Sequence, residues 1–280
     1  MHFGGYEVTS GYDESGIVIL PVPYDETSTY IKGADKGPDA IMEASPNLEY
    51  YDVETGTEAR RHGIFTLEPV TVRSSPEELC DAVEEKVRFL LKENKFPVLI
   101  GGNHTVSIGA FRAAGERYKN LSILQLDAHA DLRQEYEGSP LNHACAMARA
   151  SEVAPVVQVG IRSISAEEVP SVREENFFPA HKLYYDKSLY SRALARLNED
   201  VWITIDLDVF DPSIMPSTGT PEPGGPEYFE IMHFLEKVAA GKNIVGFDVV
   251  ELCPDPNNRM PDFVAAKVIY HLLSYIFANR

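Results

Sequence analysis

The sequence predicts an α/β fold in which helices cover both faces of a mainly parallel sheet. Short runs rich in β-branched residues alternate with longer amphipathic segments along most of the 280 residues, and this alternation is typical of βαβ units. Most of the short runs, such as "LSILQL" at 121–126, are apolar throughout, as expected for strands buried on both faces of a parallel sheet. Single α/β domains often reach this length, so we expect one domain over residues 1–280.

Each expected strand is a short apolar run bounded by turn-forming or polar residues. In chain order the strands are 16–22, 96–101, 121–127, 155–161, 182–185, 201–207 and 243–252. The expected helices are 36–46, 76–94, 105–118, 166–175, 187–199, 226–240 and 262–277. The segment 76–94 illustrates the features that predict a helix. Ser75 can cap it, Pro76 suits its first turn, and Leu79, Val83 and Val87 lie on one apolar stripe.

Two polar connections follow predicted strands directly. Residues 209–226, "VFDPSIMPSTGTPEPGGP", contain five Pro and three Gly, too many breakers for a helix or strand, and a loop of this length is typically functional. The second connection is "RQEYEGSPLNHA" at 133–144. Both lie at carboxyl ends of strands, where open α/β sheets bind their ligands.

The composition indicates a cytoplasmic protein that binds neither nucleic acid nor a membrane. Asp and Glu total 43 against 25 Lys and Arg, a net charge of −18, and such a surface repels phosphate backbones. The apolar runs are too short to span a bilayer, and no segment has the pattern of a secretory leader. Cys80, Cys145 and Cys253 have no CxxC spacing, so we expect buried thiols rather than disulfides or a zinc-thiolate site.

Three strand ends carry six potential metal ligands. They are His104 after "LIGGN", Asp127, His129 and Asp131 in "DAHAD", and Asp206 and Asp208 in "DLD". Four clustered carboxylates would repel one another, and a pair of divalent cations removes that conflict. Carboxylates and imidazoles without a thiolate favour Mn²⁺ over Mg²⁺, Fe²⁺, Co²⁺ or Zn²⁺. Six ligands also exceed what one structural zinc needs, so we expect two ions.

Each ligand taken alone also has a simpler explanation. His104 could be a turn residue and Asp206 a helix cap. "DAHAD" is similar to the start of a calcium loop, but Leu132 stands where that loop needs Gly, and no Glu closes it. The joint arrival of all six residues at one sheet edge favours the metal site.

Four segments resemble, in order and spacing, the signature segments of the ureohydrolases, the arginase and agmatinase family. They are "GGNHTVSIG", "DAHADLR", "DLDVFDPSIMPSTGTPEPGG" and "DVVELCP". Residues 21–45 are also similar to the first strand and following loop of that family. The resemblance implies a three-layer α/β/α sandwich around a mainly parallel eight-stranded sheet, and a homo-oligomer, either a trimer or a hexamer.

The resemblance also implies a binuclear manganese site whose bridging hydroxide attacks a guanidinium carbon. The ligand roles that it implies are one ion completed by His104 and Asp131, a second completed by His129 and Asp208, and bridges from Asp127 and Asp206. Glu251 in "DVVEL" matches the glutamate that pairs with the guanidinium. Asp131 would hold the proton passing to the leaving amine, and His143 matches a proposed proton shuttle, although it could instead be an exposed loop residue.

The substrate implied is a small cationic guanidino compound. "PSTGTPEPGG" resembles agmatinases more than arginases, and "DLRQEYEGSPLNHA" does not match the arginase pattern that reads the amino-acid head, so agmatine is favoured, giving putrescine and urea. Arg133 close to the site and "HAC" in place of the usual "HG" depart from the family. Arginine, guanidinobutyrate and aminopropylagmatine stay open as substrates, with Glu135 and Glu137 as candidates to bind a cationic tail.

Two further classes compete with a ureohydrolase. One is a zinc-dependent deacetylase of related fold, which would not need the complete set of six ligands together with Glu251. The other is a non-catalytic relative, which we would expect to have lost ligands. Asp211 and Asp248, close to the site in sequence, are expected to have supporting or structural roles.

Overall fold

A computed structural model describes residues 1–8 and 10–278 and contains eight strands and eight α-helices in that range. The strands are β1 (Ile17–Val22), β2 (Ile64–Thr66), β3 (Phe96–Gly101), β4 (Leu121–Leu126), β5 (Val156–Val159), β6 (Phe177–Phe178), β7 (Asp200–Asp206) and β8 (Asn243–Val250). The helices are α1 (Gly37–Ala44), α2 (Pro76–Lys92), α3 (Ser107–Arg117), α4 (Ala146–Ser151), α5 (Ala180–Tyr185), α6 (Ser188–Arg196), α7 (Tyr228–Gly241) and α8 (Met260–Phe277).

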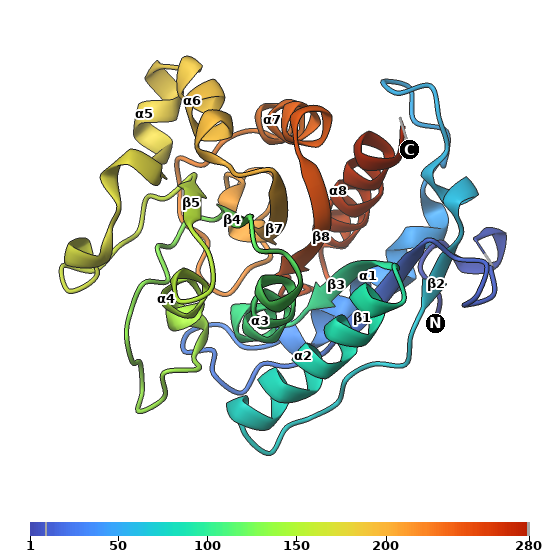
Figure 1. The fold of residues 1–280 in the computed structure, drawn as a ribbon, viewed down its shortest axis with the longest axis horizontal. Coiled ribbons are helices and arrows are strands. Elements are labelled where there is room, and N and C mark those ends of the chain that lie inside the picture. Colours follow the sequence, from blue (N-terminus) through green and yellow to red (C-terminus); the bar gives the residue numbers. More distant parts are fainter. Residues whose placement is uncertain (9, 279–280) are drawn as a thin grey trace.

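The eight strands form one sheet in the order β2-β1-β3-β8-β7-β4-β5-β6. Every neighbouring pair is parallel, so the predicted α/β fold is confirmed and the sheet is parallel throughout. Figure 1 shows the helices around this sheet, with α2 beside α3 and α7 beside α8. The central strands β3, β8, β7 and β4 therefore end side by side at one edge.

Continuous apolar strands supply both faces of the core. In β1, Ile17 and Ile19 pack in one cluster, whereas Leu20 and Val22 pack in the other. Helices α2, α3 and α4 cover the second cluster, and α1, α6, α7 and α8 cover the first. Both faces of each central strand are thus removed from water, which is why the pattern of these strands does not alternate.

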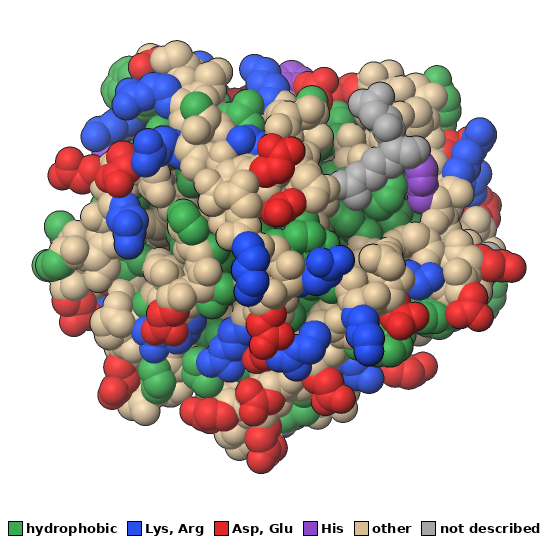
Figure 2. Space-filling view, in the orientation of Figure 1, with side chains coloured by type: hydrophobic (Ala, Val, Ile, Leu, Met, Phe, Trp, Pro, Cys, Tyr) green, Lys and Arg blue, Asp and Glu red, His purple; other side chains and the backbone are tan. Residues whose placement is uncertain are grey.

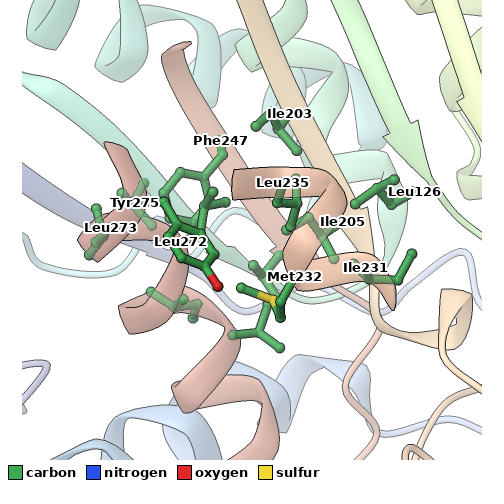
Figure 3. Packing of buried hydrophobic residues seen from close by; sticks show 14 of the residues in the cluster. Leu126, Ile203, Ile205, Ile231, Met232, Leu235, Phe247, Leu272, Leu273 and Tyr275 are labelled. Atoms are coloured by element: carbon green, nitrogen blue, oxygen red, sulfur yellow. The ribbon is translucent and has the colours of Figure 1, made fainter. Parts of the chain in front are cut away.

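The cluster beneath α7 and α8 is drawn in Figure 3. Ile231, Met232 and Leu235 of α7 and Leu272 of α8 lie against Ile203 and Ile205 of β7 and Phe247 of β8. The predicted cap of α2 is present: the Ser75 hydroxyl accepts a hydrogen bond from the Glu78 N–H at 3.2 Å.

Two predicted elements are wrong. The segment 182–185 is not a strand but part of helix α5, in which Leu183 is buried while Tyr184 and Tyr185 are 73% and 85% exposed. Aromatic residues favour strands, but one buried position in four suits a short helix turn better. The segment 166–175 is not an α-helix; it contains only short 3-10 helices at Val169–Ser171 and Glu174–Asn176, because Pro170 interrupts it and no apolar stripe supports it.

Three elements were not predicted. Strands β2 and β6 form the two edges of the sheet and are only three and two residues long, so they give almost no pattern. Helix α4 follows the predicted loop 133–144 and has six residues. The strands that carry the candidate ligands were all predicted.

The surface and the cysteines agree with the composition. On the face shown in Figure 2, acidic and basic side chains are interspersed. None of the helices in residues 1–8 and 10–278 is long and apolar enough to cross a membrane. Cys80, Cys145 and Cys253 are free and buried, as predicted.

Candidate functional site

The carboxyl ends of the four central strands converge on one cluster of polar side chains. His104 follows β3, Glu251 follows β8, and Asp206 ends β7 with Asp208 two residues on. Asp127, His129 and Asp131 follow β4 in the same way. Because these strands are sheet neighbours in the order β3-β8-β7-β4, segments up to 147 residues apart in the chain lie in contact.

Two groups of ligand atoms share Asp127. His104 Nδ1 lies 3.2 Å from Asp127 Oδ2, 3.1 Å from Asp131 Oδ2 and 3.5 Å from Asp206 Oδ2. His129 Nδ1 lies 2.8 Å from Asp208 Oδ2 and 3.7 Å from Asp127 Oδ1. The groups His104–Asp127–Asp206 and Asp127–His129–Asp208 each have the spacing of a metal site. Asp127 faces one histidine with each carboxylate oxygen, as a bridging ligand would.

Hydrogen bonds hold the carboxylates in these orientations. Asp127 accepts from the His129 N–H at 2.6 Å and from Gln125 Nε2 at 2.8 Å. The second strand end is locked similarly, because Asp206 accepts from the Asp208 N–H at 2.9 Å and Asp208 accepts from a backbone N–H beside Asp127 at 3.0 Å. The ligand positions are therefore built into the strand ends before any ion binds.

The backbone takes unusual conformations at two of these residues. Asp131 and Glu251 have left-handed φ values of 53° and 67°, which non-glycine residues adopt at a cost and often at functional sites. Gly102, two residues before the candidate ligand His104, meets a different demand: a side chain there would place its Cβ 1.9 Å from the Tyr24 carbonyl oxygen. Only glycine lets the chain pass so close to the loop after β1.

Glu251 lies at the same edge and is 8% exposed. Its Oε1 accepts a hydrogen bond from the His104 N–H at 2.7 Å. Burial raises the pKa of the Glu251 carboxyl to about 8, against the lowering effect of that hydrogen bond. A cationic group arriving beside Glu251 would favour its ionised form.

His143 is half-buried and lines the cavity in front of the ligands, rather than lying exposed on a loop. Its ring packs edge-on against Tyr136 with centroids 6.1 Å apart, and its Nδ1 has no hydrogen-bond partner among the described residues. Burial lowers the pKa of His143, so the ring is neutral near pH 7. A neutral imidazole beside the cavity, with a ring nitrogen that lacks a hydrogen-bond partner, can accept a proton.

The buried carboxylates resist ionisation unless cations accompany them. Burial, followed by the charges of Asp208 and Asp131, raises the pKa of Asp127 to about 7, and burial raises the pKa of Asp206 well above its usual value. Burial alone would lower the pKa of His129, but Asp208 and its neighbours raise it to about 11. The cluster thus collects protons, which is the behaviour of a site that divalent cations fit well.

The cavity has a volume of about 190 Å³ and is walled by loops at the carboxyl edge of the sheet. Its walls include Ser28, Thr29 and Tyr30 after β1, Ser163 and Glu168 after β5, and Thr220 in the loop 209–226. The two loops predicted to be functional both contribute, since His143 and Thr220 line the cavity. Glu135 and Glu137, the candidates for a cationic tail, are exposed and do not line it.

Glu168 is a cavity residue that the sequence did not reveal. Its side chain is 5% exposed; Oε1 accepts from the Leu132 N–H at 2.9 Å, and Oε2 accepts from the Ser165 N–H and hydroxyl at 2.8 Å. The rule that ligand sites lie at strand carboxyl ends would have found it, because "GIRSISAEE" follows β5 directly. The wrongly predicted helix at 166–175 hid that position.

Arg133, which departs from the family pattern, lines the cavity, and its charge there is paired. Its guanidinium forms an ion pair with Glu167 and lies 4.7 Å from the centroid of the Tyr136 ring. Both contacts hold Arg133 against the wall and offset its positive charge. A cationic substrate is therefore compatible with this cavity.

Comparisons with known proteins agree with the fold. The sequence model of the Arginase family matches residues 15–274. N(1)-aminopropylagmatine ureohydrolase from Synechocystis sp. is 36% identical, over 96% of this chain and 92% of that protein. An agmatinase from Pyrococcus horikoshii is 31% identical over 93% and 92%. The crystal structure of agmatine ureohydrolase of Thermoplasma volcanium has a TM-score of 0.90 and 30% identity, covering 98% of this chain and 94% of that one.

Proposed function

Because this chain belongs to the arginase family of ureohydrolases, we propose that it hydrolyses the guanidinium group of agmatine to give putrescine and urea. The observation that carries the proposal is the pair of histidine–aspartate groups that share Asp127 at the floor of the cavity. A one-ion deacetylase or a binding protein has no need of both groups.

The two groups would hold two Mn²⁺ ions. His104 and Asp131 would complete one ion and His129 and Asp208 the other, with Asp127 and Asp206 between them. The fit rests on oxygen and imidazole donors without thiolate, within 4.8 Å of one another in each group. When bound, divalent cations lower the pKa of water and so provide hydroxide near neutral pH, which a delocalised guanidinium needs as its nucleophile.

The remaining residues orient the substrate and move the proton. Glu251 pairs with the guanidinium cation and fixes the carbon in front of the ligand cluster. Asp131 holds the proton that leaves the attacking water, and His143 passes it to the amine nitrogen as the carbon–nitrogen bond breaks. The neutral state that burial gives His143 suits this exchange at pH 7. The step balances when both protons of the water reach the leaving nitrogen, one through Asp131 and His143 and the other from the hydroxyl of the carbon adduct as its C=O bond forms, so that guanidinium and water give urea and an alkylammonium ion.

Glu168 supplies a place for the substrate's ammonium group. It is a buried carboxylate in the cavity wall and accepts from the N–H of Leu132, the residue after Asp131, and Arg133 nearby is already paired with Glu167. A substrate with a guanidinium at one end and an ammonium at the other would meet a carboxylate at each. This arrangement favours agmatine over guanidinobutyrate, whose carboxylate Glu168 would repel.

N1-aminopropylagmatine is a second candidate substrate. A relative with that name is 36% identical to this chain, compared with 31% for the agmatinase. The cavity mouth also carries exposed Tyr30, Ile31 and Ile164, along which the extra methylene groups of a longer polyamine could lie. The product would then be spermidine instead of putrescine.

Urea release from the Mn²⁺-loaded protein tests the proposal. We expect agmatine to give a higher kcat/KM than arginine and 4-guanidinobutyrate, by at least tenfold. A higher kcat/KM for N1-aminopropylagmatine than for agmatine would select the second candidate. If no guanidine yields urea while an acetylated polyamine yields acetate, the proposal fails. We also propose that the protein is a cytoplasmic trimer or hexamer, and the oligomeric state of the Mn²⁺-loaded protein should be measured as well.

A further inference from the structure

The two ring nitrogens of His104 contact different kinds of groups. Nδ1 faces the carboxylates of Asp127, Asp131 and Asp206. Nε2 points into the sheet, where it lies 2.8 Å from Thr204 Oγ1. Thr204 is the register partner of Asp248 on the neighbouring strands β7 and β8, and its hydroxyl is 2.5 Å from Asp248 Oδ1.

Asp248 is fully buried and accepts from three donors. Its Oδ1 accepts from Thr204 and from the Ser107 hydroxyl at 2.8 Å, and its Oδ2 accepts from Trp202 Nε1 at 2.7 Å. A carboxylate can only accept, so the single hydrogen of Thr204 is committed to Asp248. The Thr204 oxygen must then accept from His104, which places a hydrogen on Nε2 and, in the neutral ring, leaves the lone pair on Nδ1.

We propose that Asp248, acting through Thr204, is a positioning residue that holds His104 in the tautomer whose Nδ1 can bind a cation. The inference rests on the proposed two-ion site and deepens it. His129 provides the contrast: its Nε2 lies 3.4 Å from the hydroxyl of exposed Thr220, and its side chain is 25% exposed. No such buried carboxylate among the described residues fixes the His129 tautomer, so the two ions should respond differently to a change at Asp248.

Asp248→Asn should reverse the direction of the hydrogen bonds from Asp248 through Thr204 to His104. The indole N–H of Trp202 can only donate, so the asparagine oxygen must face Trp202 and its amide must face Ser107 and Thr204. The two hydroxyls can rotate to accept, and Thr204 then donates to His104 Nε2. The hydrogen of the neutral ring moves to Nδ1, which can no longer bind a cation.

Mn²⁺ titration of metal-free protein, followed by the EPR signal of free Mn²⁺, counts the bound ions without measuring turnover. We expect Asp248→Asn to weaken one of the two ions about 10–100-fold and to leave the other within about threefold of the unmodified protein. Thr204→Val, which removes the hydroxyl but keeps the shape, should weaken the same ion. Thr204→Ser, which keeps the hydroxyl, should bind both ions normally.

A double substitution separates hydrogen-bond direction from packing. Trp202→Phe removes the fixed donor, so in Asp248→Asn/Trp202→Phe the amide is free to turn its oxygen back toward Thr204. Part of the lost Mn²⁺ affinity should return, although the loss of the indole lowers stability. If Asp248 only filled space, the double variant should lose further Mn²⁺ affinity.

The outcomes distinguish this inference from the two-ion proposal. Two ions bound with normal affinity by folded Asp248→Asn, or equal weakening of both ions, would overturn the role of Asp248. Should Asp248→Asn fail to fold, by circular dichroism, normal binding of both ions by Thr204→Val would overturn it instead. If the unmodified protein binds fewer than two Mn²⁺, the two-ion site is contradicted. The role of Asp248 is then overturned only if Thr204→Val leaves the binding of the remaining ion unaffected.

Discussion

At the scale of single residues, the proposed function makes Glu168 the group that binds the ammonium tail of the substrate. Its carboxylate is held by the N–H groups of Leu132 and Ser165, so it cannot rotate away from the cavity wall. A fixed, buried carboxylate interacts more strongly with a cation than a mobile exposed one does. Recognition of the ammonium tail should therefore depend on Glu168 and not on the loop acids.

Glu168→Gln should raise the KM for agmatine about tenfold, because one charge-assisted interaction is lost, and should change kcat little. A matched substrate, butylguanidine, has the same chain without the ammonium and should show no increase in KM. Glu135→Gln removes an exposed loop acid outside the cavity and should leave the kinetics with both substrates unchanged. An equal rise in KM for the two substrates would instead point to displacement of the two loops that contain Leu132 and Ser165.

The sequence predicts the candidate ligands but not the groups that surround them. A buried apolar strand ending in Asp or His is unusual enough in sequence to predict a ligand, and all six candidates do lie at one sheet edge. Asp248 and Thr204 differ, because their roles depend on register between strands that are far apart in the chain. The pairing of Arg133 with Glu167 depends on a loop crossing that no local pattern records.

At the scale of elements, Arg162 anchors the loop 209–226. Its guanidinium donates to the carbonyls of Asp208 at 2.6 Å, Val209 at 3.1 Å and Glu222 at 2.8 Å, so it joins the start of the loop to its far end. A Cβ at Gly225 would lie 2.6 Å from both the Val209 carbonyl oxygen and the Asp211 nitrogen, so only glycine fits at this point of the loop. Arg162 thus anchors both the candidate ligand Asp208 and the loop that contains the cavity residue Thr220.

Arg162→Met should loosen this loop because several inward-facing carbonyls lose their donor. We expect a fall of about 2 kcal/mol in the free energy of unfolding and faster amide hydrogen exchange confined to residues 209–226, measured by mass spectrometry. Arg88→Met is the control, because Arg88 on α2 pairs only with exposed or partly exposed acids and should leave that exchange unchanged. Unaltered exchange in 209–226 for Arg162→Met would show that the loop is held by other contacts.

The elements that were predicted correctly share a physical property. Strands β3, β4, β7 and β8 are buried on both faces, so composition alone identifies them. The edge strands β2 and β6 are too short to show any period, and α5 is stabilised by the packing of Leu183 against residues distant in sequence. The intrinsic propensity of "KLYY" favours a strand, but its packing against the rest of the protein makes it part of a helix.

At the scale of the whole molecule, the ligand cluster makes stability without metal depend on pH. Burial raises the pKa of Asp127 from 3.8 to about 7 and that of Glu251 from 4.5 to about 8. Between pH 4 and 8 the folded chain therefore binds more protons at these groups than the unfolded chain does, and stability falls as pH rises. His129 acts in the same direction above pH 6.5, since its pKa is raised to about 11. Asp208 acts oppositely, with a pKa lowered to about 2, but only at acidic pH.

The melting temperature of the chelated protein should consequently fall as pH rises from 5 to 8.5. Divalent cations replace the bound protons, so the increase in melting temperature on adding Mn²⁺ should be larger at pH 8 than at pH 6. Asp127→Asn removes one of the titrating groups and should flatten the profile of the chelated protein. A melting temperature that rises over this range in the absence of metal would mean that the cluster is ionised and already compensated in the folded chain, and the electrostatic reason for a two-ion site would no longer hold.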